Sequence, residues 1–194
     1  FTDLDNDGKI DLIVVGEFMD VHIFKNTGNK FQKTDQDFNL KGWWNEIMVM
    51  DIDNDKDLDL VLGNLGLNSR FKASKELPIK LYYSDFDKNG SFESILTKKF
   101  EDDKFYPYHL RHSLVNRLPG LKKKFPDFKS FKNADIESVF TKDQLKSAQI
   151  HEVVELKSLI LVNNGNMKFE VRELPSSVQY SCMYAMEKLD VNND

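Results

Sequence analysis

The segment DLDNDGKIDLIV, residues 3–14, carries the clearest structural signal in the chain, because its spacing of residue types recurs. A second copy, DIDNDKDLDLVL, occupies residues 51–62, and a third, DFDKNGSFESIL, occupies residues 85–96. A shortened fourth copy, DVNND, starts at Asp190. A spacing that recurs within one chain is typical of repeat architectures, in which each repeat forms one supersecondary unit. The sequence therefore predicts a repeat protein.

Each copy begins with a loop that places oxygen-bearing side chains at its first, third, fifth and ninth positions. Alternate residues of a tight loop point toward one centre, and Ca²⁺ prefers about six to eight oxygen ligands. The carbonyl at the seventh position is the expected main-chain ligand, and glycine at the sixth permits the sharp turn. The predicted metal ligands are Asp3, Asp5, Asp7, the Lys9 carbonyl and Asp11; Asp51, Asp53, Asp55, the Asp57 carbonyl and Asp59; Asp85, Asp87, Asn89, the Ser91 carbonyl and Glu93; and Asp190, Asn192 and Asp194.

The same loops resemble two other kinds of structure. An EF-hand loop starts in the same way, but it needs a bidentate acid at its twelfth position and a helix on each side. The twelfth positions here are Val14, Leu62 and Leu96, so we reject the EF-hand. Clusters of Asp, Asn and Gly also form ordinary turns without a metal, although three loops in one register favour calcium. In the second loop Lys56 replaces the glycine, which predicts backbone strain and weak or absent metal binding there.

Short apolar runs beside the loops predict β strands that are buried on both faces. They lie at residues 12–15, 60–62 and 81–83. The segments IFKNTGNKF, residues 23–31, and LVNNGNMKF, residues 161–169, read as β hairpins, because Asn and Gly tolerate the positive φ of tight turns.

The region from about residue 106 to 157 departs from this strand pattern. Apolar residues between Val139 and Leu156 fall mostly at helical spacing, and Thr141 is a suitable N-cap for a helix over Thr141 to Leu156. We predict a helical insertion within one repeat, broken into short pieces by Pro107, Pro119 and Pro126.

Composition excludes several classes of protein. A formal net charge of −5 gives no general electrostatic reason to expect nucleic acid as a partner. No run of about 18 apolar residues occurs, so no transmembrane segment is expected in this chain. The single cysteine, Cys182, excludes an internal disulfide and a multi-cysteine zinc site. Because Phe1 falls inside a motif, we expect the chain to be part of a longer protein.

Other residues of interest have ordinary explanations. His109 and His112 are three apart but lack an acid at matching spacing, which favours a structural role. The run Lys122–Lys124 reads as a solvated face, with an anion contact as the alternative. Core packing is favoured over a sugar-stacking platform for Trp43 and Trp44 with Phe71. No catalytic motif is found, so we predict a protein that is not an enzyme.

The units FTDLDNDGKIDLIVVG, residues 1–16, and VMDIDNDKDLDLVLGN, residues 49–64, resemble the FG-GAP or VCBS repeats of integrin-α-like β-propellers. The longer segment at residues 42–91, which begins GWWNEIMVM, is similar to a subgroup of large exported bacterial VCBS-repeat proteins. Many of those proteins are surface-associated lipoproteins. LPGLKKKF, at residues 118–125 of the insertion, is also similar to that subgroup.

The resemblance implies a mainly β fold made of four-stranded antiparallel β-propeller blades with a helical insertion. It implies propeller blades with three cation loops over residues 1–105, the helical insertion over residues 106–157, and a return to a propeller blade with a truncated fourth cation loop over residues 158–194. The family's cation ligands carry over to the acidic loop residues given above, with Ca²⁺ as the cofactor.

The function implied is a calcium-binding module for ligand binding or protein assembly at the bacterial cell surface. The alternative is part of a polysaccharide-acting, lyase-like propeller enzyme, and a structural spacer is a third possibility. Expected partners are other proteins or surface glycans, together with the remaining propeller blades of the same protein. The expected location is extracellular, periplasmic or associated with the outer-membrane surface.

Overall fold

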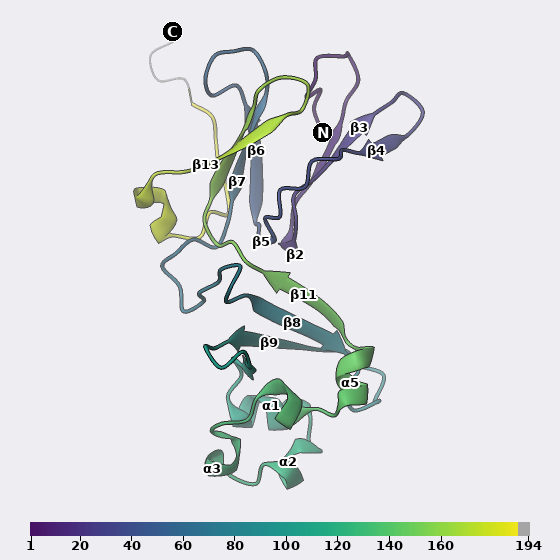
Figure 1. The fold of residues 1–194 in the computed structure, drawn as a ribbon, viewed down its shortest axis with the longest axis vertical. Coiled ribbons are helices and arrows are strands. Elements are labelled where there is room, and N and C mark those ends of the chain that lie inside the picture. Colours follow the sequence, from purple (N-terminus) through teal and green to yellow (C-terminus); the bar gives the residue numbers. More distant parts are fainter. Residues whose placement is uncertain (190–194) are drawn as a thin grey trace. The chain divides into compact units, whose positions relative to one another are not determined.

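The computed structural model describes residues 1–189, and Figure 1 shows the order of their elements. The chain divides into two compact units. The first unit comprises residues 1–72 together with the chain from Glu155 onward, and the second comprises residues 73–154. The second unit is therefore inserted in the sequence of the first.

The main sheet of the first unit has four antiparallel strands in the order β13-β12-β7-β6. Every residue of β7 is buried, as expected for an apolar run that lies between two neighbouring strands. Leu60 of β7 pairs with Val49 on one side and with Leu161 on the other. The strands are β6 (Glu46–Met50), β7 (Asp59–Gly63), β12 (Leu159–Asn163) and β13 (Phe169–Glu173).

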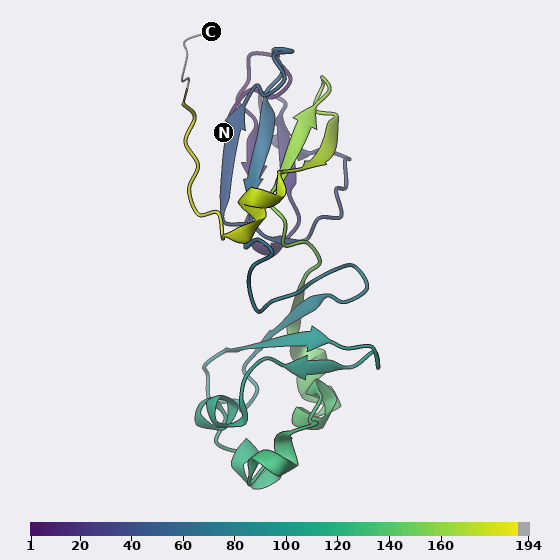
Figure 2. The same cartoon turned by 90° about the vertical axis from the view of Figure 1, so that its left-hand side faces the viewer.

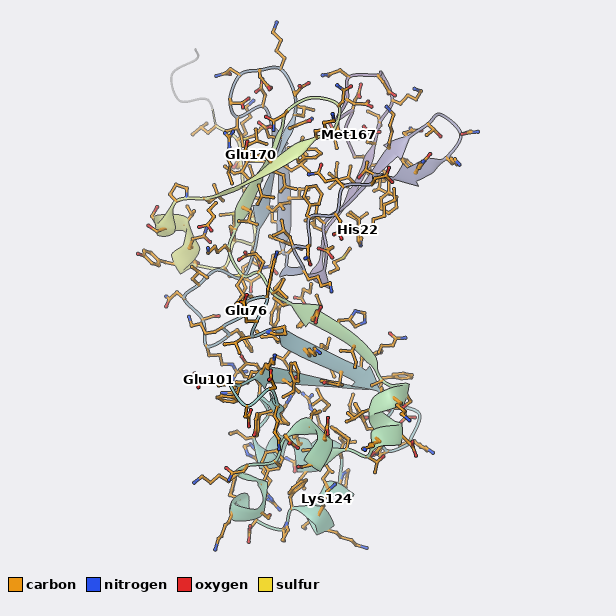
Figure 3. All side chains as sticks on the ribbon, viewed as in Figure 1. His22, Glu76, Glu101, Lys124, Met167 and Glu170 are labelled. Atoms are coloured by element: carbon orange, nitrogen blue, oxygen red, sulfur yellow. The ribbon has the colours of Figure 1, made fainter. Side chains whose placement is uncertain are left out.

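Two smaller sheets complete the strands of this unit. One has the order β1-β3-β4 and the other pairs β2 with β5. Trp44 and Leu4 are buried in the shared apolar core, and Met167, labelled in Figure 3, joins it from the β12–β13 turn. The elements are β1 (Leu12–Val14), β2 (Glu17–Met19), β3 (His22–Asn26), β4 (Phe31–Lys33), β5 (Gly42–Trp43) and the 3₁₀ helix η1 (Ser176–Tyr180).

The second unit contains a sheet in the order β10-β9-β8-β11 and five short helices. Figure 2 shows the helices on one side of this sheet, where Phe86 and Phe140 stack in the core with ring centroids 4.1 Å apart. The strands are β8 (Ile79–Ser84), β9 (Glu93–Lys99), β10 (Phe105–Pro107) and β11 (Gln149–Val153). The helices are α1 (Arg111–Arg117), α2 (Leu121–Lys124), α3 (Phe128–Phe131), α4 (Ile136–Val139) and α5 (Lys142–Ser147).

The helix predicted from Thr141 is shorter than the sequence pattern suggested. Thr141 caps α5 as expected, because its hydroxyl accepts a hydrogen bond from Gln144 N, but the helix ends at Ser147. Residues Gln149–Val153 instead form β11, which pairs along its whole length with β8. The β-branched Ile150 and Val153 suit this strand, and the exposed edge of β8 supplies its hydrogen bonds.

The predicted fold class is confirmed in its coarser part. The described residues form antiparallel sheets with few and short helices, so the fold is mainly β. Two of the four sheets have four strands, but residues 1–189 form no closed propeller. Within those residues no helix is long and apolar enough to cross a membrane.

Candidate cation sites

Three acidic loops form the candidate site: the first loop (residues 3–11), the second loop (51–59) and the third loop (85–93). The second joins β6 to β7, and the third joins β8 to β9. The first loop is closed by an antiparallel bridge between Thr2 and Asp11 and leads into β1. Strands therefore adjoin all three loops, an arrangement that differs from the two helices of an EF-hand.

The carboxylate at the first position organises each loop by accepting a backbone N–H from the sixth position. The nitrogen–oxygen distances are 2.8 Å from Gly8 to Asp3, 3.0 Å from Lys56 to Asp51 and 2.9 Å from Gly90 to Asp85. The chain turns back on itself at that sixth residue, whose φ is 82° for Gly8, 77° for Lys56 and 91° for Gly90. The positive φ predicted for Lys56 is thus present, in a region that side chains other than glycine rarely adopt.

The acid at the ninth position is buried in every loop. It accepts the N–H of the second residue, at 2.9 Å for Leu4 to Asp11, 2.8 Å for Ile52 to Asp59 and 3.0 Å for Phe86 to Glu93.

In the first unit the other oxygen of this acid accepts a further backbone N–H. Asn26 N lies 2.8 Å from Asp11 Oδ1, and Asn163 N lies 2.8 Å from Asp59 Oδ1. These two acids therefore connect their loops to strands β3 and β12, whereas within residues 1–189 Glu93 accepts only the bond inside its own loop.

Carboxylates at the first, third and ninth positions converge in all three loops. In each group one oxygen per side chain lies within 4.8 Å of the others, a spacing that one cation could bridge. Among the described residues these are the groups of three or more acidic, histidine or cysteine side chains with such convergence. They are Asp3, Asp5 and Asp11; Asp51, Asp53 and Asp59; and Asp85, Asp87 and Glu93.

The side chains at the fifth position make a local turn instead. They accept the N–H of the seventh residue at 2.9 Å, 2.8 Å and 2.7 Å, and Asp7 and Asp55 lie outside the converging groups. The pairs are Asp7 with Lys9, Asp55 with Asp57, and Asn89 with Ser91. Asp190, Asn192 and Asp194 of the shortened fourth loop lie outside the described residues.

Two buried oxygen atoms test whether these residues suit a cation. Asp5 Oδ1 and Asp51 Oδ1 are buried and accept no hydrogen bond in the described structure. The Asp5 side chain is only 7% exposed. A buried carboxylate oxygen without a donor is costly, and a hard cation is the partner that an oxygen cluster of this kind would satisfy.

A lysine that sequence reasoning missed contacts the first loop. Lys25 Nζ pairs with Asp5 Oδ2 and lies 3.4 Å from Asp7 Oδ2, and Lys9 Nζ lies 3.0 Å from the same Asp7 oxygen. The hydrogen bond to Asp5 raises the pKa of Lys25, and the hydrogen bond from Lys9 lowers the pKa of Asp7. Lys25 belongs to β3 and lies 20 residues from Asp5 in the sequence. No local sequence pattern therefore indicates that it contacts the first loop.

The second loop has the opposite electrostatic character. Desolvation raises the pKa of Asp53, and the charges of Asp55, Asp59 and Asp51 raise it further. Asn6 of the first loop donates to Asp57 Oδ1 at 3.0 Å, so the Asp57 side chain points toward a neighbouring loop. The carboxylates of the second loop therefore repel one another, and a cation would relieve this repulsion.

The other residues considered from the sequence lie away from the loops. His109 lines a cavity in the second unit, His112 is exposed, and Lys122–Lys124 lie in α2. Trp44 is buried, while Trp43 is partly buried and contacts Phe18 and Phe71 with ring centroids 4.8 Å and 5.2 Å apart.

Comparison with known proteins gives one match. A family model for the FG-GAP-like repeat matches residues 3–62 of the chain. No curated protein and no solved structure matches it. The matched segment contains the first and second loops, strands β1 to β6 and β7 up to Leu62. Residues 3–62 are thus similar to an FG-GAP-like repeat.

Proposed function

We propose that this protein is a calcium-binding β-propeller module that binds ligands or assembles proteins at the bacterial cell surface. The observation that carries the proposal is the repeated geometry of three loops, in which three carboxylates converge within 4.8 Å. Unpartnered buried oxygens on Asp5 and Asp51 add support, because they identify atoms that a cation would coordinate.

Calcium would act as a structural cross-link. In each loop it would join acids from the first, third and ninth positions, and the ninth-position acid is already bonded to the second residue of the loop. Binding would neutralise carboxylates that otherwise repel one another and would lower the cost of ordering the turn. Extracellular calcium modules bind at about 10⁻⁴ to 10⁻³ M, which suits a location outside the cytoplasm.

The propeller part of the proposal rests on two four-stranded antiparallel sheets and on the FG-GAP-like match. Propellers usually contain about four to eight such sheets arranged around an axis. The proposal therefore requires further blades as partners of these sheets. Surface glycans or other proteins would bind the assembled module.

Thermal unfolding tests the calcium part. The metal-free chain is melted with increasing Ca²⁺, and we expect the melting temperature to rise in the millimolar range, because a ligand that binds only the folded state stabilises it. Mg²⁺ at equal concentration is the control, and we expect a smaller shift since Mg²⁺ demands a smaller, octahedral site. Equal shifts with both ions, or none with calcium, would contradict calcium binding.

We do not propose catalysis. A lyase-like reaction would need a base beside a cation, and the cavity that holds Tyr106 and His109 is lined by none of the carboxylates of the three loops. Binding is tested instead by a glycan array and by affinity capture from the bacterial surface, with the heat-unfolded chain as the control. Capture of a specific partner with no glycan bound would favour assembly, and failure of both assays would contradict the binding role.

A further inference from the structure

The second unit contains a cavity of about 650 Å³ that the cation loops do not use. Its wall comes from the end of β9, from β10, from the start of α1 and from α3. A volume of this order is typical of sites that hold small molecules or short oligomers, which span roughly 300 to 1,000 Å³.

Positive charge dominates the wall of the cavity. Lys98, Arg111, Lys129 and Lys132 line it, whereas no Asp or Glu does. The whole chain has a formal net charge of −5, so this cluster opposes the overall charge of the protein. Within the described residues, none of the three lysines forms an ion pair.

Acidic residues that adjoin the cavity are engaged elsewhere. Asp102 accepts a hydrogen bond of 2.7 Å from the Tyr106 hydroxyl. Asp135 lies 3.0 Å from Lys104 Nζ, and Asp127 caps α3. These contacts leave the three lysines of the wall available for an anion from solution, while Arg111 also interacts electrostatically with Asp127.

Aromatic rings accompany the cations. Lys98 Nζ lies 4.4 Å from the centre of the Phe100 ring and 5.6 Å from that of Tyr108. Phe128 is 63% exposed, and Arg111 Cζ lies 5.9 Å from the centre of its ring. Exposed ring faces beside cations can receive the flat face of a ligand ring while the cations bind its acidic groups.

Arg111 is held in place by the backbone around it. Its Nε and Nη2 atoms each donate a bond of 2.7 Å, to the carbonyls of Phe125 and Pro126. The remaining N–H groups of the guanidinium stay available, and a fixed guanidinium is well suited to bind a carboxylate.

We propose that this cavity binds an acidic oligosaccharide, in which sugar rings and carboxylates alternate. Several separated cations with interleaved rings match a ligand that repeats one ring face and one negative charge, whereas a ligand with a single charge would use one cation. The proposal deepens the ligand-binding part of the proposed function, and it does not depend on calcium binding.

Calorimetric titration of the whole chain tests the proposal with trigalacturonate, and with maltotriose as a neutral trisaccharide. EDTA is present throughout, because oligouronates bind calcium themselves. We expect trigalacturonate to bind in the millimolar range or tighter, and maltotriose to bind at least about tenfold more weakly for want of charge pairing. No binding of trigalacturonate, or equal binding of the two sugars, would overturn the proposal.

Variants locate the binding. Lys98→Met and Lys132→Met are each expected to lower the affinity for trigalacturonate by about fivefold, because each removes one partly exposed charge pair. Phe128→Ala is expected to lower this affinity by a similar factor, because the sugar ring loses its stacking contact with the Phe128 ring. Lys123→Met, on an exposed face of α2 outside the cavity, is the matched control. Equal effects of Lys98→Met and Lys123→Met would place binding elsewhere and overturn the proposal.

A nucleotide also combines a flat ring with negative charge, so AMP forms a third arm. Tighter binding of AMP than of trigalacturonate would overturn the sugar assignment. A calcium-induced rise in melting temperature without any trigalacturonate binding would leave the calcium proposal intact and reject only this inference.

Discussion

The first and second loops share one pattern of acids and most of their hydrogen bonds, although Asp3 Oδ1 accepts the N–H of Asp7 and the equivalent Asp51 Oδ1 accepts none among the described residues. A lysine occupies a different place in each loop. In the first loop Lys25 brings an ammonium group to Asp5 and Asp7, while Gly8 makes the turn without strain. In the second loop no lysine pairs with the converging acids among the described residues, and Lys56 itself occupies the positive-φ position.

The two loops therefore differ in two properties that affect cation binding: the strain of the backbone at the sixth position and the positive charge beside the acids. The first loop has glycine at its sixth position, where φ is 82°, but Lys25 holds a positive charge beside its acids that would compete with a metal ion. The second loop has a strained backbone at Lys56, and no lysine pairs with its converging acids among the described residues. Desolvation and the neighbouring carboxylates raise the pKa of Asp53, although the charge of Arg172 also acts on Asp53 and Asp59. The third loop has Gly90 at its sixth position, and among the described residues no lysine pairs with its converging acids, so it serves as the reference for these two features.

The largest expected effect concerns the shared ninth-position acid. Asp59→Ala would leave the N–H groups of Ile52 and Asn163 without an acceptor, and we expect a loss of about 2–4 kcal/mol in the unfolding free energy of the metal-free protein. Urea unfolding followed by tryptophan fluorescence measures it, since both tryptophans lie in the first unit.

Asp59→Asn keeps the shape but only one acceptor oxygen for the two N–H groups, so we expect it to cost less than Asp59→Ala while still destabilising the protein. The corresponding Asp11→Ala should cost a similar amount, since Asp11 also accepts two backbone N–H groups. Glu93→Ala, followed by circular dichroism, should cost about half as much, because it removes a single such bond. Equal costs for Glu93→Ala and Asp59→Ala would show that these hydrogen bonds are not the cause.

The charge difference predicts an effect on affinity. Lys25→Met should strengthen calcium binding at the first loop by about five- to tenfold, because it removes a cation that pairs with Asp5. Calorimetry is performed with the second and third loops disabled by Asp53→Asn and Asp87→Asn. Lys30→Met, in the nearby β3–β4 turn, should leave the affinity unchanged. A lower affinity in Lys25→Met would mean that Lys25 organises the loop for the ion.

The backbone difference predicts effects of opposite sign at the same loop position. Lys56→Gly should stabilise the metal-free protein by about 1 kcal/mol, since glycine adopts a φ of 77° without strain. Gly8→Ala should destabilise it by about the same amount, although an added Cβ would meet nothing within 4 Å. Urea unfolding measures both, and stabilisation in both variants would contradict the strain argument.

The smallest expected effect is a direct coupling between the two loops. Asn6 donates to Asp57 at 3.0 Å on the surface, so a double-mutant cycle with Asn6→Ala and Asp57→Ala should give a coupling of about 0.5 kcal/mol. A coupling of zero would mean that the two loops respond to substitution independently.

The features of the molecule that depend on local residue spacing could be predicted from the sequence. The alternation of acids in a nine-residue loop brings the first, third and ninth side chains together, and Gly, Asn and Asp favour the turns that allow it. The mainly β class followed in the same way from short apolar runs between turns.

Contacts made between distant segments could not be predicted. Lys25 contacts the first loop because β3 pairs with β1. Strand β7 pairs with β12, although the whole second unit separates these two strands in the sequence. The helix predicted from the spacing around Ile150 was wrong, because that segment forms a strand that pairs with β8. Such pairings depend on tertiary context, which overrides local propensity.

Calorimetric titration of Ca²⁺ into the metal-free chain and its Asp5→Asn, Asp53→Asn and Asp87→Asn variants provides the sharpest test. We predict that each substitution at the third loop position removes or strongly weakens binding of one Ca²⁺ and leaves the remaining binding events in place. A titration without heat up to about 10 mM calcium, well above the range of extracellular modules, would contradict the proposal. Heats that stay unchanged in all three variants would place the ion outside these loops.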